Sequence, residues 1–86
     1  MKAVILYKPN SEAESSVLGY VHDFEYQTGK TITLLDCESP EGVEKSKAYD
    51  ILQFPAVVAL RDDGSFVESW IDREKWPTIS ELSYYS

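Results

Sequence analysis

Thiol and imidazole side chains are scarce in this chain, which has one cysteine and one histidine among its 86 residues. A single cysteine excludes an internal disulfide and any zinc site built from cysteines alone. It also excludes dithiol redox chemistry within the chain, because that chemistry needs two thiols. One cysteine is compatible with a reducing compartment. We expect neither a metal ion nor another cofactor in this protein.

Long apolar runs and clusters of positive charge are also missing. No apolar run approaches the roughly 20 residues that span a bilayer, and the run at residues 3–7 is too short for the core of a signal peptide. We therefore predict a cytoplasmic protein without membrane contact. Eight basic residues against 15 acidic ones give a net charge of −7, which disfavours binding to nucleic acid.

The chain does contain enough apolar sequence for one small folded domain. Hydrophobic residues make up 43% of the chain and aromatic residues 13%, well outside the range of disordered proteins. Because a chain of this length forms one compact unit, we predict a single domain over residues 1–86. We expect a monomer whose acidic surface keeps it soluble.

Short apolar runs alternate with amphipathic stretches and predict the order β-α-β-α-β-β-α. The expected strands lie at residues 2–7, 31–35, 56–60 and 65–71, and the expected helices at residues 11–27, 39–49 and after 78. A helix separates the first two strands, so they should be parallel, whereas an Asp-Gly turn joins the last two into a hairpin. The sequence therefore predicts an α/β fold in which helices flank a four-stranded mixed sheet.

A serine or threonine precedes each predicted helix and is expected to cap it. The capping residues, each with its partner at the helix start, are Ser11 with Glu14, Ser39 with Pro40, and Thr78 with Glu81. For Ser11 this capping box competes with a catalytic role, since a serine without a neighbouring base is a poor nucleophile. The only histidine, His22, lies about three turns further along the same predicted helix.

The most specific pattern consists of Tyr49 at a helix end, a short loop, Phe54-Pro55, an apolar strand and an Asp63-Gly64 hairpin. In this pattern the sequence resembles the thioredoxin-like superfamily at its small, glutaredoxin-sized end. The resemblance implies a thioredoxin-like βαβαββα fold over nearly the whole chain. It also implies that a cis peptide bond precedes Pro55. This cis-proline either leaves Phe54 with exposed backbone groups that can pair with an extended peptide or with glutathione, or simply shapes the turn into the strand.

The chain departs from this superfamily at the positions of its thiol chemistry. Many members have Lys-Pro-Gly-Cys-x-x-Cys where this chain has residues 8–14, so Ser11 replaces the nucleophilic cysteine and Glu14 the resolving one. Ile5 stands where a thioredoxin would have a buried acid. Residues 70–74 lack the glycines with which glutaredoxins bind glutathione. The resemblance thus implies a member of the superfamily without dithiol activity.

Cys37 is the one thiol that is still available for reaction. It follows the second predicted strand, at the same sheet edge as Ser11 if the first two strands are parallel, and open α/β sheets bind ligands at that edge. Asp36 and Glu38 flank it, and their negative charges should raise the pKa of the thiol. Two interpretations of Cys37 remain open, namely a reactive monothiol and an inert, partly buried cysteine.

The leading hypothesis is a redox-inactive binding or interaction module. Its groove would be framed by Asn10, Ser11, Phe54 and Pro55, and it would take a peptide or a protein partner. The alternative is an atypical monothiol oxidoreductase or redox sensor in cell redox homeostasis, which would use Cys37. Only the alternative makes this protein an enzyme.

Two further surfaces have simpler interpretations. Trp70, Trp76, Tyr84 and Tyr85 make the C-terminal third rich in aromatic residues, which close the core or, if exposed, mediate a homodimer or a complex. The carboxylates of residues 36, 38 and 41 are interpreted as a solvated acidic surface. Nothing in the sequence makes them converge on a metal ion.

Overall fold

Eight elements of secondary structure are present in the computed structural model, which describes residues 2–85. They are β1 (Lys2–Tyr7), α1 (Glu14–Thr28), β2 (Thr33–Asp36), α2 (Pro40–Ala48), β3 (Ala56–Leu60), β4 (Phe66–Trp70), the 3-10 helix η1 (Arg73–Lys75) and α3 (Ile79–Ser83). The predicted order of strands and helices is confirmed, and η1 is an addition that the sequence did not predict. β2 begins two residues later than predicted, and β4 is one residue shorter at each end. Within residues 2–85 no helix is long and apolar enough to cross a bilayer.

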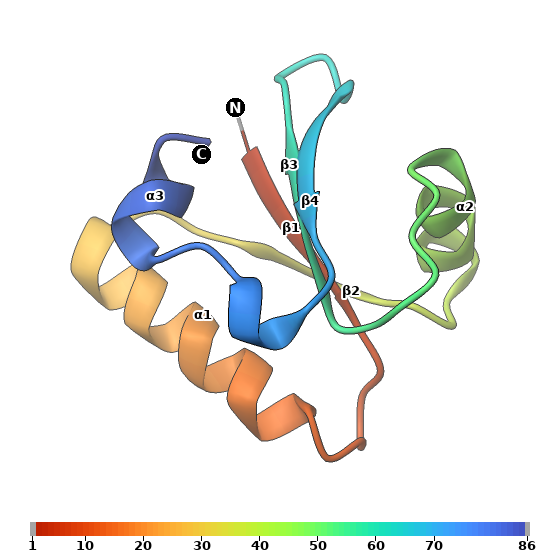
Figure 1. Ribbon diagram of the computed structural model, residues 1–86, viewed down its shortest axis with the longest axis horizontal. Helices are drawn as coiled ribbons and strands as arrows, with labels where there is room; N and C mark the ends of the chain where they lie inside the picture. Colours follow the sequence, from red (N-terminus) through yellow and green to blue (C-terminus); the bar gives the residue numbers. More distant parts are fainter. Residues whose placement is uncertain (1, 86) are drawn as a thin grey trace.

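The four strands form one mixed sheet in the order β2-β1-β3-β4. β1 and β2 are parallel, as expected of strands joined through a helix, whereas β3 is antiparallel to both β1 and β4. The register between β1 and β3 ends at the pair Leu6 and Ala56, so Pro55 lies just beyond the last pair. α1 and α3 lie on one side of the sheet and α2 lies on the other (Figure 1). The predicted α/β architecture, with a four-stranded mixed sheet flanked by helices, is confirmed.

The face of the sheet toward α1 and α3 carries the larger apolar core. Side chains at alternate positions of a strand point to opposite faces, which places Ala3 and Ile5 of β1 on this side. They belong to one buried cluster with Val17, Val21 and Phe24, which recur at helical spacing along α1. This apolar stripe is the reason why α1 packs flat against the sheet.

The face toward α2 is packed through small residues of that helix. Gly42 and Ser46 are its buried residues, and the Ser46 hydroxyl donates a hydrogen bond to the Gly42 carbonyl oxygen at 2.7 Å. A Cβ atom on Gly42 would collide with the carbonyl oxygen of Asp36 and would lie 3.0 Å from the Cα atom of Cys37. The backbone of α2 therefore packs directly against the end of β2.

Two of the three predicted helix caps are confirmed. The Ser39 hydroxyl accepts a hydrogen bond from the Gly42 N–H at 3.0 Å, within the first turn of α2. The Thr78 hydroxyl accepts one from the Glu81 N–H at 3.1 Å, within the first turn of α3. Both caps satisfy backbone donors that have no partner inside the helix, and so they fix where α2 and α3 begin.

The predicted cap at Ser11 is wrong. α1 begins at Glu14, and its N-cap residue is Ala13, which makes no side-chain capping bond. The Ser11 hydroxyl instead donates to the carbonyl oxygen of Lys8 at 2.6 Å, and the Glu14 carboxylate accepts from the Asn10 N–H at 3.2 Å. Asn10 has a positive φ of 63°, so the chain turns once more before the helix starts. The two polar side chains hold this loop rather than the helix end.

The close approach of α2 predicts that Gly42→Ala destabilises the fold, because the added methyl group meets the carbonyl oxygen of Asp36. We expect the free energy of unfolding, measured by urea denaturation, to fall by about 1–3 kcal/mol. The matched control is Gly19→Ala in α1, where the added methyl group meets open space and should be neutral or stabilise by up to about 1 kcal/mol. Equal stabilities of the two variants would contradict the backbone packing of α2.

Candidate functional site

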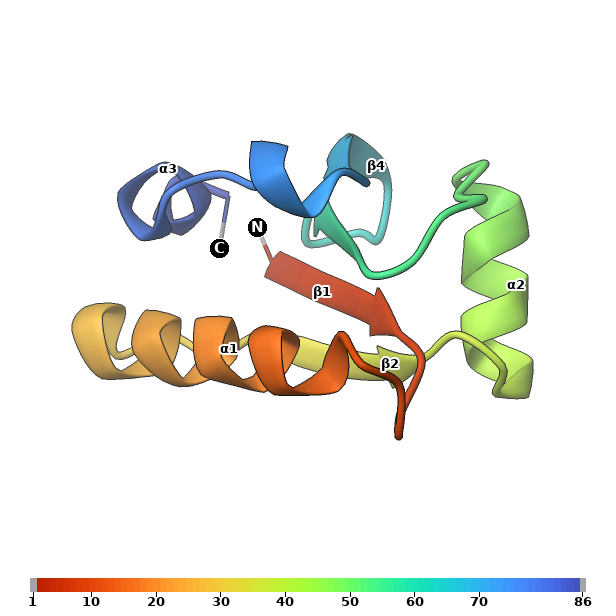
Figure 2. The same ribbon diagram turned by 60° about the horizontal axis from the view of Figure 1, so that its bottom comes forward.

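Three chain segments meet at the edge of the sheet where β1 and β2 end. Because these two strands are parallel, the loop after β1 and the turn after β2 lie at the same edge. β3 runs in the opposite direction, so its first residue, Ala56, and the preceding Phe54-Pro55 lie at this edge as well. Figure 2 shows this edge, with the ends of β1 and β2 close to the N-terminal end of α1.

A cleft with a volume of about 530 Å³, the loop cleft, opens between these segments. Its lining residues are Lys8, Ser11, Glu12, Ala13, Cys37, Glu38, Phe54 and Pro55. Three of the four predicted binding residues, Ser11, Phe54 and Pro55, are therefore in one cleft. The predicted thiol, Cys37, lines the same cleft. The fourth predicted residue, Asn10, does not line it but shapes the loop through its positive φ.

The backbone at Phe54 lies outside the hydrogen-bond ladder of the sheet. The Phe54–Pro55 peptide bond is cis, and the first residue of β3 is Ala56, which pairs with Leu6. The side chain of Phe54 is 38% exposed although it is large and apolar. Exposed apolar surface beside backbone that has no strand neighbour is typical of a place where an extended segment binds.

Ser11 lies far from the only imidazole of the chain. His22 lies eight residues beyond the first residue of α1, which is roughly 12 Å along the helix. Its ring stacks with that of Tyr26 at a centroid distance of 6.4 Å. The hydroxyl of Ser11 donates a hydrogen bond to the Lys8 carbonyl oxygen, so this serine shapes the loop.

Cys37 lies in the loop cleft as a largely buried thiol. The residue is only 8% exposed, and this burial is the main cause that raises the pKa of its thiol. The negative charges of Asp36 and Glu38 raise the pKa further, while the ammonium of Lys8 acts in the opposite direction. The predicted direction of the pKa shift is confirmed, and burial is a larger cause than the flanking charges that the sequence showed.

The charges that line the loop cleft are two carboxylates and one ammonium. Lys8 and Glu38 form an ion pair with 3.3 Å between ammonium and carboxylate, and Glu12 adds a second negative charge. Among residues 2–85, no three His, Cys, Asp or Glu side chains are grouped so that they could hold a metal ion. The loop cleft therefore presents an apolar wall with a mildly acidic rim.

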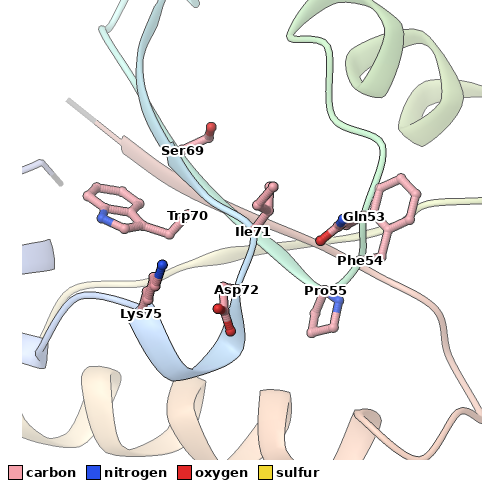
Figure 3. Close-up of a pocket in the computed structure, with 8 residues that line it drawn as sticks. All are labelled: Gln53, Phe54, Pro55, Ser69, Trp70, Ile71, Asp72 and Lys75. Carbon is pink, nitrogen blue, oxygen red and sulfur yellow. The ribbon is translucent and has the colours of Figure 1, made fainter.

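A second cleft, the strand-end cleft, has a volume of about 750 Å³ (Figure 3). Its lining residues are Gln53, Phe54, Pro55, Ser69, Trp70, Ile71, Asp72 and Lys75. Phe54 and Pro55 line both clefts and form their common wall. In the sequence, residues 70–74 are notable because they contain no glycine, and nothing there indicates that they line a cleft. The sequence feature that could have indicated this cleft is the apolar pair Trp70-Ile71 at the end of β4.

The comparisons with known proteins concern the fold. No protein-family model and no curated protein matches this sequence. The structure is similar to that of thioredoxin 1 from the thermophilic eubacterium Thermosipho africanus TCF52B, with a TM-score of 0.66 and 14% sequence identity. The similarity covers 99% of this chain and 89% of that thioredoxin. The chain therefore has a thioredoxin-like fold, as the resemblance in its sequence implied, and at this identity the similarity shows the fold alone.

The raised pKa of Cys37 predicts slow alkylation at neutral pH. Because the thiolate is the reactive form, the rate should rise with pH and reach half its maximum above the ordinary cysteine pKa of about 8.5. Iodoacetamide labelling followed by mass spectrometry, from about pH 6 to about pH 10, measures this midpoint. Glu38→Gln removes one cause of the shift and should lower the midpoint, whereas Glu41→Gln should leave it unchanged. A midpoint at or below about 8.5 in the parent protein would contradict this account of the thiol.

Proposed function

We propose that this protein is a thioredoxin-like binding module without thiol chemistry, which holds an extended peptide segment of a partner protein in the loop cleft. The observation that carries the proposal is the meeting of Ser11, Phe54 and Pro55 in one cleft beside backbone outside the sheet ladder. Extended peptides bind such backbone as an added strand does, through main-chain hydrogen bonds. The single cysteine suits the reducing cytoplasm as the place of action.

Two features of the site support binding without disulfide exchange. Ser11 and Glu14 stand where the related dithiol enzymes have cysteines, and both side chains are hydrogen-bonded within the loop. The remaining thiol, Cys37, is buried and has a raised pKa, so little of it is thiolate at neutral pH. The loop therefore has a defined shape and offers no activated nucleophile.

The charge of the loop cleft favours a neutral or basic segment over an anion. Lys8 is already paired with Glu38, and Glu12 contributes a further negative charge to the rim. The whole chain carries a net charge of −7, which attracts cations and repels anions over a longer range. Glutathione is an anion at neutral pH, and we expect it to bind more weakly than a basic peptide.

An NMR titration of the ¹⁵N-labelled protein tests this proposal. The probe is a capped threonine octapeptide with lysine at both ends, and glutathione is titrated in parallel. We expect the peptide to shift the amide signals of Ser11, Cys37 and Ala56 in the loop cleft, and glutathione to shift them less. Such signals report the cleft directly because each of these residues lines it or adjoins it.

A matched pair of variants makes the titration specific. Ser11→Tyr places a ring in the loop cleft and should weaken peptide binding by roughly tenfold or more, since the ring occupies the space of the ligand. Ser15→Tyr places the same ring on an exposed position of α1 outside both clefts and should leave the affinity unchanged. Equal affinities of the two variants, or unchanged signals in the parent protein at millimolar peptide, would speak against the proposal.

The second candidate function is an atypical monothiol oxidoreductase or redox sensor that uses Cys37. One observation favours it, namely that the thiol lines the same cleft in which the peptide would lie. Incubation with oxidised glutathione at neutral pH, followed by mass spectrometry, distinguishes the two functions. A mixed disulfide that forms within minutes, and is absent in Cys37→Ser, would support the monothiol function, whereas absence of the adduct would favour binding alone.

A further inference from the structure

We infer that the strand-end cleft holds a large apolar side chain of the bound segment and thereby selects the partner. This inference rests on the proposed function, because the segment reaches the strand-end cleft from the loop cleft. Phe54 and Pro55 are the common wall of the two clefts. Successive side chains of an extended segment point to opposite sides, so a segment paired with the Phe54 backbone presents side chains to both clefts.

The walls of the strand-end cleft suit an apolar side chain. Four of its eight lining residues are apolar or aromatic, namely Phe54, Pro55, Trp70 and Ile71. Phe54 is 38% and Ile71 43% exposed, so both leave apolar surface in contact with water. Covering this surface with an apolar side chain of the ligand removes it from water, which favours binding.

Trp70 gives the strand-end cleft a rigid wall. It is the last residue of β4 and pairs with Val57 of the buried strand β3. Its ring packs edge-on against that of Tyr85, with 5.4 Å between centroids and an interplanar angle of 70°. Figure 3 shows Trp70 and Phe54 at opposite sides of the cleft. A wall that is fixed before binding loses little conformational freedom when a ligand arrives.

The charges of the two clefts indicate what lies beside the apolar side chain. Asp72 and Lys75 carry opposite charges within the strand-end cleft, and the Asp72 carboxylate already accepts a hydrogen bond from the Glu74 N–H at 3.1 Å. The loop cleft has two carboxylates against one ammonium. The partner segment that fits both clefts therefore combines a large apolar residue with lysine or arginine close to it in the sequence.

A series of three peptides tests this inference on the whole chain. They are capped threonine octapeptides with lysine at both ends and with alanine, leucine or tryptophan at one central position. We expect the leucine and tryptophan peptides to bind roughly tenfold or more tightly than the alanine peptide. These two should also shift the amide signals of Ser69, Trp70 and Ile71, which the alanine peptide should leave nearly unchanged.

Substitutions at two residues of nearly equal exposure locate the apolar contact. Ile71→Ser removes part of the cleft wall and should reduce the ratio of leucine to alanine affinities by about threefold or more. Leu18→Ser changes a residue of α1 that is 44% exposed and lines neither cleft, so the ratio should stay as in the parent protein. The peptide series on the parent protein decides the question alone if Ile71→Ser does not fold.

The outcomes separate this inference from the function on which it rests. Equal affinities of the three peptides, with shifts confined to the loop cleft, would overturn the selection by an apolar side chain and leave peptide binding intact. No shift in either cleft with any of the peptides would overturn both. A loss of selectivity in Leu18→Ser but not in Ile71→Ser would place the apolar contact on α1 and overturn the inference.

Discussion

Five residue pairs join β1 to β3 at the centre of the sheet, and the position of both clefts depends on their register. β3 is buried along its whole length, and so are the four inner residues of β1. Because side chains alternate between faces, a slip of one residue would move Ile5 or Val57 to the wrong layer. The register ends with Leu6 and Ala56, which leaves Phe54-Pro55 beyond the last pair as the wall between the clefts.

The helices on the two sides of the sheet are packed by different means. On the α1 side, large side chains such as Phe24 fill the core. On the other side α2 approaches through Gly42, whose backbone lies against the junction of Asp36 and Cys37. Burial of Cys37 at this junction is the main cause of its raised pKa. The close approach of α2 and the buried thiol thus lie at the same junction.

The order of the elements could be predicted from local signals, whereas the start of α1 and the second cleft could not. Ser39 caps its helix as predicted, since its hydroxyl has the Gly42 N–H within reach. Ser11 has the same side chain but bonds to a carbonyl oxygen of the preceding loop, a choice that depends on backbone dihedrals the sequence does not show. The resemblance to the thioredoxin-like superfamily predicted that Phe54-Pro55 frames a groove. Trp70 joins that region only through its pairing with β3, which is a long-range contact.

The binding function proposed above has no disulfide step, so a partner would be held by non-covalent contacts alone. A dithiol enzyme of this fold can hold its substrate through a mixed disulfide, and Ser11 cannot form one. Main-chain hydrogen bonds replace bonds to water and contribute only about 0.5–1.5 kcal/mol each. Burial of one large apolar side chain contributes about 1.5–3 kcal/mol, as much as two such bonds. In the proposed function, the exposed apolar surface of Phe54 and Ile71 would therefore supply the contact that most increases affinity.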